Sequence, residues 1–402
     1  MLSVAEALDA VLDHCVALPP RSVPLRDALG CLLAEDIAAD LDLPPFDKSL
    51  MDGFAVRTSD LEPTGETWLK VGETITAGMM PTRPVEPGEA AAIMTGAPIP
   101  AGADTVVPVE RSSYDAMGVR LNDPEARPGR HILTRGREMQ AGEIVARRGE
   151  RLNPARLGLL ASVGLIRVSV HSRPRIAIVP TGDELVEPDR VPGPGQIRNS
   201  NATLLEALAS KAGAVSRTTS IAPDQPQALA DRLSDGLQDD LLLITGGVSA
   251  GKLDLVPAAL ERLGVTKVFH KIKVKPGKPL WFGVGPSRAH GHPGTLVFGL
   301  PGNPVSAAVG FALMVAPAIE VLAGGSKRAR TLASYPLAHG MEHRGDRPTY
   351  QPARLVNGKV EPLAWAGSSD LRSLAAADGL AVFAEGDRDY LVGELIPFLD
   401  LS

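Results

Sequence analysis

Four carboxylates follow or lie near short aliphatic runs in the middle of the chain and offer hard oxygen ligands. Asp183 and Glu184 follow the run Ile176–Val179 after three residues, Asp224 lies in an Ala-Pro-Asp turn, and Asp254 stands near the start of a predicted helix. Mg²⁺ prefers oxygen ligands and usually bridges protein carboxylates and substrate phosphates. If the runs are neighbouring strands, these side chains converge on one rim. An aspartate at a helix start is also a common N-cap, so Asp254 alone leaves both roles open.

A glycine-rich loop follows the second aliphatic run, Leu241–Ile244, and its composition suits an anion. The loop consists of Thr245, Gly246, Gly247, Val248 and Ser249. Adjacent glycines let main-chain N–H groups approach a phosphate, and a following helix adds its dipole. The same pattern also makes an ordinary turn from strand to helix, so the loop alone leaves both interpretations open. It matches neither the P-loop pattern nor the dinucleotide-binding fingerprint.

A basic segment at residues 271–278 carries lysines at alternate positions. The alternation predicts a strand with Lys271, Lys273 and Lys275 on one face. Solvent-facing lysines are the ordinary interpretation of such a strand. The Pro-Gly turn after Lys275 places Lys278 close by, however, and two ammonium groups on one tight turn suit an oxyanion or a diphosphate.

The elements around these residues predict a parallel sheet covered by helices. A third run, Leu296–Phe298, ends in a loop that contains Pro301 and Asn303. Helices are predicted between the runs, at Ala202–Ser210, Gln225–Leu237 and Leu253–Leu263. Strand, small-residue loop and helix in repetition are typical of α/β domains. Such sheets bind ligands at the carboxyl ends of their strands, where these loops gather.

The regions before and after these elements have different sequence patterns. Residues 1–38 predict two short helices, and residues 39–134 predict short strands such as Ala90–Met94 and Thr105–Val109. Asn153-Pro154 has the N-cap and N1 signature of a helix that runs to about Val163.

After residue 326 the sequence again has the pattern of short β-strands. Asn357-Gly358 predicts a hairpin, because this dipeptide suits the positive φ angles of a type I′ turn. Leu380–Phe383 and Tyr390–Leu395 predict a second hairpin through Gly386. The apolar stretch Val305–Ile319 predicts a buried helix, since it is short for a bilayer span.

Composition narrows the classes of function. The 402 residues include 41 basic and 47 acidic side chains, and a net charge of −6 argues against a nucleic-acid partner. The two cysteines, Cys15 and Cys31, form no CxxC pair and predict neither a disulfide framework nor a structural zinc site. The first ten residues lack the order of a signal peptide. We therefore expect a protein of the cytosol, with no membrane partner.

Seven segments, in order, resemble the molybdopterin molybdenumtransferase family, the MoeA proteins, whose eukaryotic relative is the gephyrin E domain. They are PPFDKSLMDGFAV (44–56), IMTGAPIPAGAD (93–104), PTGDEL (180–185), GQIRNSN (195–201), TGGVSAGKLD (245–254), KVKPGKP (273–279) and GLPGNPVSA (299–307).

The resemblance implies an α/β plus β fold in four parts. N-terminal helices and an elongated linking region take residues 1–38 and 135–172, and an inserted β-rich domain takes 39–134. A MogA-like molybdopterin-binding α/β domain with a parallel-rich sheet takes 173–325, and a C-terminal β-barrel domain takes 326–402. The resemblance also implies a homodimer whose active sites combine the α/β domain of one subunit with the inserted domain of the other. A MogA-type protein is a candidate partner.

The resemblance further implies a reaction and a set of site residues. Family members take adenylated molybdopterin and molybdate, with Mg²⁺, to molybdenum cofactor and release AMP. The implied catalytic residues are Asp52, Thr95, Glu184, Asp224 and Asp254, with Asp224 and Asp254 as our candidates for Mg²⁺. The implied binding residues are Thr181, Gly182, Asp183, Thr245, Gly246, Gly247, Ser249, Lys275, Lys278, Pro301 and Asn303.

Two positions depart from the family pattern. Leu133 stands where the family has a basic side chain, although Arg135 and Arg137 are nearby substitutes, and Pro352 stands where it has an arginine. Three hypotheses follow: a molybdenum insertase, a tungstate-handling paralogue, and a gephyrin-like scaffold without activity. A scaffold has no need of the rim carboxylates, so their presence favours an enzyme.

Overall fold

The computed structural model describes residues 1–63, 65–115, 117–247, 255–287, 294–327 and 332–401. The chain divides into two compact units, Met1–Ala34 with Val168–Ser402 and Glu35–Arg167. Each unit is described separately below. The finer division into four parts stays a prediction.

A six-stranded sheet forms the centre of the first unit, in the order β16 (Val215–Thr218), β13 (Arg175–Pro180), β17 (Leu241–Thr245), β20 (Leu296–Leu300), β19 (Trp281–Val284), β18 (Thr266–His270). The first four strands are parallel, and β19 is antiparallel to both of its neighbours. Pro180, Thr245 and Leu300 pair across β13, β17 and β20, so these three strands end at one level. The predicted parallel-rich sheet is confirmed.

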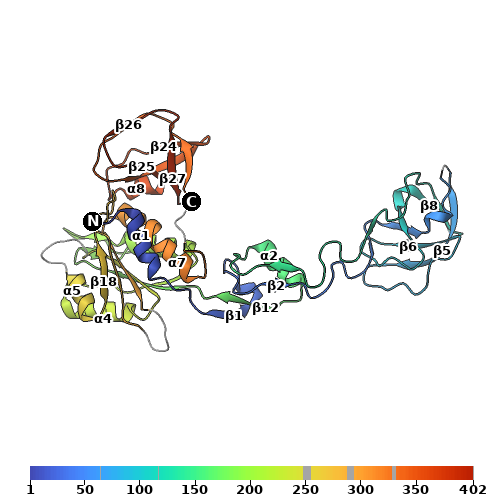
Figure 1. The fold of residues 1–402 in the computed structure, drawn as a ribbon, viewed down its shortest axis with the longest axis horizontal. Helices are drawn as coiled ribbons and strands as arrows, with labels where there is room; N and C mark the ends of the chain where they lie inside the picture. The colour runs from blue at the N-terminus through green and yellow to red at the C-terminus, as the bar shows by residue number, and fades with distance from the viewer. Residues whose placement is uncertain (64, 116, 248–254, 288–293, 328–331, 402) are drawn as a thin grey trace. The chain divides into compact units, whose positions relative to one another are not determined.

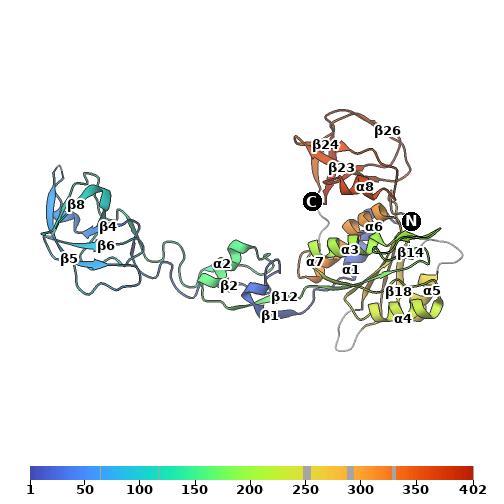
Figure 2. The same ribbon diagram turned by 180° about the vertical axis from the view of Figure 1, so that it is seen from behind.

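Helices cover both faces of this sheet (Figures 1 and 2). One face packs against α1 (Val4–Asp13), α3 (Ser200–Lys211), α6 (Pro304–Gly310) and α7 (Ala316–Leu322), and the other against α4 (Pro226–Gly236) and α5 (Leu255–Arg262). Ile176 and Ile178 point into the first core, whereas Ala177 and Val179 point into the second. A strand buried on both faces reads as a continuous aliphatic run, which is why the sequence showed it clearly.

One helical stretch, Pro304–Leu322, is long and apolar enough to cross a membrane, and 89% of its most apolar window is buried inside the protein. It contains α6, a π-helical turn at Phe311–Val315, and α7. Its side chains belong to the first core beside the sheet. The predicted buried helix is confirmed.

The C-terminal part of this unit is a curled antiparallel sheet. Its order is β21 (Ala333–Pro336), β27 (Leu395–Asp400), β25 (Gly379–Phe383), β23 (Thr349–Val356), β24 (Lys359–Pro362), and β22 (Met341–His343) pairs separately with β26 (Arg388–Tyr390). A bridge between Leu337 and Val360 joins the two edges, which gives the predicted barrel character. Asn357 and Gly358 have φ angles of 50° and 73°, as the predicted β23–β24 hairpin requires.

The second unit is rich in strands, as expected. Its six-stranded sheet has the order β7 (Thr105–Pro108), β4 (Gly53–Val56), β6 (Glu89–Ile93), β5 (Thr67–Ile75), β9 (Val119–Leu121), β8 (Ser112–Tyr114). Two short pairs accompany it, β3 (Lys48–Ser49) with β10 (Ile132–Leu133) and β2 (Ile37–Ala38) with β11 (Ile144–Ala146). Helix α2 (Pro154–Ser162) begins where predicted, because Asn153 caps it by accepting from the amide of Arg156 at 2.8 Å.

Three local predictions were wrong. The second helix predicted within residues 1–38 is only a 3-10 turn at Leu25–Asp27. Before it, β1 (Pro20–Pro24) pairs with β12 (Arg167–His171), because its two prolines bar a helix interior. The strand predicted at Tyr390–Leu395 is mostly the turn between β26 and β27, so β25 pairs with β27 and with β23 instead. The lysine segment is no regular strand, since Ile272 bridges to Leu2 and Lys275 bridges to Thr349. Only the alternation of burial agrees with the predicted strand, because Ile272 and Val274 are buried.

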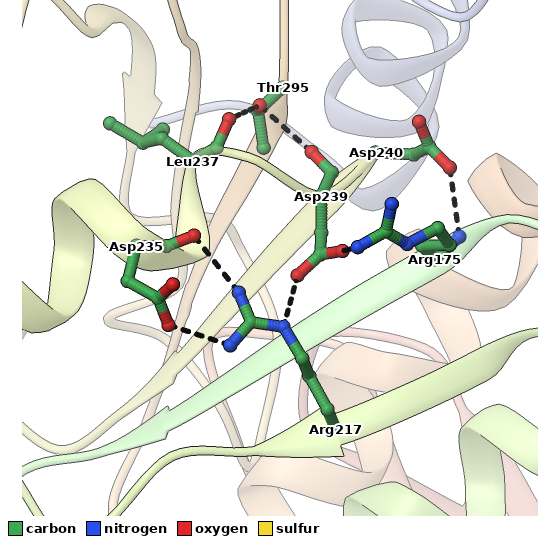
Figure 3. A network of polar contacts seen from close by, with 7 residues as sticks. All are labelled: Arg175, Arg217, Asp235, Leu237, Asp239, Asp240 and Thr295. Carbon is green, nitrogen blue, oxygen red and sulfur yellow. Dashed lines mark hydrogen bonds and ion pairs between the residues drawn. The ribbon is translucent and has the colours of Figure 1, made fainter.

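A charge network closes the amino end of the central sheet (Figure 3). The Asp239 carboxylate, whose side chain is 1% exposed, pairs with Arg217 Nε at 2.6 Å and with an Arg175 guanidinium nitrogen at 2.7 Å. Arg217 also pairs with Asp235 at 2.6 Å. Asp239 therefore ties the starts of β13 and β16 to the loop before β17.

We expect Asp239→Asn to destabilise the protein by about 2–3 kcal/mol. The variant removes the buried negative charge that pairs with Arg175 and Arg217. Asp235→Asn is the matched control: that side chain is 54% exposed, and exposed pairs contribute at most about 1 kcal/mol. Urea denaturation of both variants measures the difference. Equal midpoints would contradict a structural role for Asp239.

Candidate functional site

Three loops lie side by side at the carboxyl ends of β13, β17 and β20. The amide of Thr181 donates to the carbonyl of Thr245 at 2.9 Å, and the amide of Gly246 donates to the carbonyl of Leu300 at 3.3 Å. The Thr181 hydroxyl also donates to the Thr245 carbonyl, at 3.2 Å. Because the strands end in register, these bonds continue the sheet by one step and place the loop residues at one rim.

The two glycines after β17 are required by their backbone and by their neighbours. Gly246 and Gly247 have φ angles of 87° and 62°, a region that residues with a Cβ rarely adopt. A Cβ on Gly246 would lie 2.5 Å from the Thr181 carbonyl oxygen, and one on Gly247 would lie 3.0 Å from the Thr181 hydroxyl. The glycines therefore allow the first and second loops to approach closely.

A cleft of about 370 Å³ opens at this rim. It is lined by Thr181, Glu184, Leu185, Ile197, Arg198, Asn199, Ser200, Asn201, Thr245, Gly246, Gly302, Asn303, Pro304, Ser369 and Leu371. Five of the predicted site residues are among them: Thr181, Glu184, Thr245, Gly246 and Asn303. Pro301, the residue directly after β20, is also buried.

A larger cleft of about 1020 Å³ is lined by residues at the opposite, amino ends of the strands, including Arg175, Val215 and Asp240. It holds none of the predicted site residues. Parallel sheets bind their ligands at the carboxyl ends of the strands, so the smaller cleft is the candidate site.

The acidic residues of the rim are partly brought together. The amide of Asp224 donates to Asp183 Oδ1 at 3.0 Å, and a bridge between Thr181 and Ala222 holds the Asp224 turn at the end of β13. The Glu184 carboxylate lies against Gly182, where an added Cβ would meet it. Ser249 and Asp254 lie outside the described residues.

The described carboxylates of the rim can be compared with what a resident Mg²⁺ needs. Among the described residues, no three His, Cys, Asp or Glu side chains form a group that could hold a metal. Mg²⁺, however, commonly takes only one or two protein carboxylates and completes its shell with phosphate oxygens and water. Asp183 and Asp224, exposed at the rim, offer such hard oxygens.

The two lysines of the predicted anion turn lie on the segment between β18 and β19. The Lys275 backbone is held from both sides, because its amide donates to Pro348 at 2.9 Å and its carbonyl accepts from Tyr350 at 2.7 Å. The Lys278 carbonyl accepts from Ile272 at 3.0 Å. Both side chains are exposed. Their backbones are therefore anchored while their ammonium groups stay accessible to an anion.

Asp52 and Thr95 meet in the second unit. The Thr95 amide and hydroxyl both donate to Asp52 Oδ1, at 2.7 and 2.8 Å. These two bonds, the backbone bond first, lower the pKa of Asp52 below its ordinary value. The carboxylate is therefore ionised at neutral pH, and both bonds from Thr95 use the same one of its oxygens. The other predicted catalytic residues belong to the first unit.

We expect Thr95→Val to raise the pKa of Asp52 toward its ordinary value, because the variant removes one of the two bonds that favour the charged form. A folded-state pKa below the unfolded one stabilises the protein above the unfolded pKa, and this stabilisation is lost as the pH falls through the folded pKa. The loss of stability that Asp52 contributes on acidification should therefore be smaller in the variant and should be complete at a higher pH. Carbon-13 NMR titration of the carboxylates measures the shift, and an unchanged titration would contradict it.

The two residues that depart from the family pattern are not among those that line the cleft. Leu133 pairs with Lys48 between β10 and β3, and Pro352 is buried within β23. Arg135 is no ready substitute for a basic side chain at 133, because its guanidinium pairs with Asp42 at 2.7 Å.

Sequence analysis missed several residues of the cleft. Asn199 and Asn201 enter it from the start of α3, and Ser369 and Leu371 enter it from the C-terminal part of the chain. The two asparagines carried a signal, since they belong to the GQIRNSN segment. The other two carried none, because only the folded chain brings them to the rim.

Family models match almost the whole chain. Residues 2–164 match the MoeA N-terminal region (domain I and II), residues 177–321 match a probable molybdopterin binding domain, and residues 335–401 match the MoeA C-terminal region (domain IV). The second match contains the three loops of the cleft.

Relatives and solved structures agree with these models. Molybdopterin molybdenumtransferase 2 of Mycobacterium tuberculosis is 36% identical over the full length of both chains. The molybdopterin molybdenumtransferase of Synechococcus elongatus is 36% identical over 97% of each chain. A crystal structure of a molybdopterin biosynthesis MoeA protein from Pyrococcus horikoshii superposes with a TM-score of 0.81 at 29% identity, covering 100% of this chain and 99% of that one. This chain belongs to the molybdopterin molybdenumtransferase family.

Proposed function

We propose that this chain inserts molybdate into adenylated molybdopterin, giving molybdenum cofactor and releasing AMP. The observation that carries the proposal is the cleft at the carboxyl ends of β13, β17 and β20, which gathers Thr181, Glu184 and Gly246 in a chain of this family. Its backbone amides, hydroxyls and carboxylate are the groups that a phosphorylated, hydrogen-bonding substrate needs.

Charge neutralisation is the main task of the phosphate-binding residues. Lys275 and Lys278 bind the diphosphate or the incoming oxyanion, and the Gly246-Gly247 backbone approaches it closely. Bound Mg²⁺ would neutralise the diphosphate as AMP leaves, and Asp224 with Asp254 are the residues we assign to hold it. Such electrostatic stabilisation is usually the largest catalytic contribution.

The remaining carboxylates are assigned to the metal-accepting end of the substrate. We place Asp52, with Thr95, and Glu184 around molybdate and the dithiolene. Asp52 is suited to this because Thr95 uses only one of its oxygens. The residues Gly182, Asp183, Thr245, Pro301 and Asn303 shape the loops that bind the pterin substrate.

Assembly and location complete the proposal. The family resemblance supports a homodimer in the cytosol, with active sites shared between subunits, and a MogA-type protein that delivers the substrate. The mass of the purified protein in solution tests the dimer directly.

The deciding experiment is AMP release from adenylated molybdopterin by the purified protein with Mg²⁺, in parallel with molybdate, with tungstate and with neither anion. Oxyanion-dependent release supports the insertase, and the preferred anion separates molybdate from tungstate handling. Substrate that binds without AMP release would indicate that the Leu133 and Pro352 departures have removed catalysis. A protein that binds no substrate would instead be a scaffold.

A further inference from the structure

One side chain of the cleft has an acceptor atom without a donor. Asn201 stands in the first turn of α3, is 8% exposed and lines the cleft. Its Nδ2 donates to the Gly302 carbonyl at 2.7 Å. Its Oδ1 is buried and has no hydrogen-bond partner in the described part of the chain.

The bond to Gly302 fixes which way this amide points. A carbonyl oxygen only accepts, so the nitrogen of the Asn201 amide must face Gly302 and the oxygen must face away from it. A buried acceptor without a donor is costly, and native proteins rarely keep one without a reason. Neighbouring Asn199 differs, because its Oδ1 accepts from the amide of Ala202 at 3.2 Å and caps α3.

The surroundings of Asn201 restrict what could supply the missing donor. The Glu184 carboxylate lines the same cleft, so the cleft combines an anion with a neutral acceptor. A phosphate offers only acceptors, so it cannot supply the donor that Asn201 Oδ1 lacks. Adenine offers one amino donor flanked by ring acceptors. A pterin offers an exocyclic amine beside a ring N–H, which are two adjacent donors on one edge.

We propose that Asn201 Oδ1 accepts a hydrogen bond from the 2-amino and N3–H edge of the pterin ring, which makes this cleft the pterin-selecting subsite. The inference rests on the proposed function, and it adds that the cleft recognises the pterin part of the substrate. Asn201 is thus a specificity residue, and the diphosphate lies toward the glycine loop and the lysines.

The test uses the full-length protein and three small probes. Pterin carries the 2-amino group, lumazine replaces that amine with a carbonyl, and AMP lacks the pterin altogether. Binding is followed by quenching of probe fluorescence for the first two and by calorimetry for AMP. The wild type should bind pterin at least tenfold tighter than lumazine, because a site built for a donor rejects an acceptor there.

Two variants separate a specific role from a merely structural one. Asn201→Leu has a similar size but no acceptor, and it should lose the preference for pterin over lumazine while AMP affinity stays within twofold. Asn201→Gln keeps both an amide donor for Gly302 and an acceptor oxygen, and it should keep that preference. Loss of pterin and AMP binding together in Asn201→Leu, or loss of the preference in Asn201→Gln, would overturn the assignment.

The wild type separates this inference from the proposed function. Oxyanion-dependent AMP release without any preference for pterin over lumazine would overturn the subsite and leave the insertase intact. Absence of AMP release together with a clear pterin preference that depends on Asn201 would overturn the insertase and leave the subsite intact.

Discussion

Replacing Asp52 with asparagine is expected to lower molybdate-dependent AMP release by about two to three orders of magnitude while pterin binding stays measurable. Both Thr95 donors use Asp52 Oδ1, and an asparagine places its own carbonyl oxygen there. The local structure should therefore persist. The variant loses the negative charge and the second oxygen, which are the features we assign to the metal-accepting end of the site.

Asp47→Asn is the matched control for this prediction. Asp47 is also an exposed aspartate in the same segment, and its Oδ1 accepts from the backbone amide of Arg135 at 2.7 Å. The same change of charge there should alter the rate by no more than about twofold. Single-turnover AMP release measures both variants, and an Asp52→Asn protein with wild-type rates would refute the catalytic role of Asp52.

The central sheet was predictable because it is buried on both faces. Ile176–Val179 and Leu241–Ile244 each read as an unbroken aliphatic run, and each ends in a loop of small residues, so the sequence marks both the strand and its carboxyl end. The register across Pro180, Thr245 and Leu300 follows once the strands are parallel neighbours. This register brings the predicted loops to one cleft.

Elements whose partners are distant in sequence were harder to predict. The predicted hairpin partner of β25, Tyr390–Leu395, falls mostly on the turn between β26 and β27, and β25 pairs with β27 while β26 pairs with β22. Ile272 and Val274 alternate with lysines and are buried in one core, yet the backbone of this segment bridges to Leu2 at Ile272 and to Thr349 at Lys275 instead of continuing one ladder. Local patterns report which side chains are buried and do not report what buries them.

The same limit applies to the candidate site. Glycines and carboxylates at strand ends are recognisable by type and position, which is why Gly246 and Glu184 were found. Asn201 looks like an ordinary polar residue at the start of a helix. Only the fold shows that Gly302 accepts from its amide nitrogen while its oxygen is buried without a donor. The role we propose for Asn201 therefore depends on a contact with a residue that is 101 positions away in the sequence.

Substituting alanine for Gly246 is expected to destabilise the protein by about 3 kcal/mol and to weaken pterin binding at least tenfold, because two separate effects combine there. The φ of 87° disfavours any residue with a Cβ, and that Cβ would lie 2.5 Å from the Thr181 carbonyl oxygen. This oxygen belongs to the backbone of the neighbouring loop. It can move only if the loop after β13 moves with it.

Gly358→Ala isolates the first effect from the second. Gly358 has a φ of 73° in the β23–β24 turn, and an added Cβ there would meet nothing within 4 Å. That variant should cost only about 1 kcal/mol, the cost of the backbone conformation alone, and leave pterin binding unchanged. Urea denaturation and pterin titration of both variants give the comparison. If Gly246→Ala is no worse than its control in either measurement, the close approach of the two loops does not form the binding cleft, because displacing Thr181 would then have no consequence for the substrate.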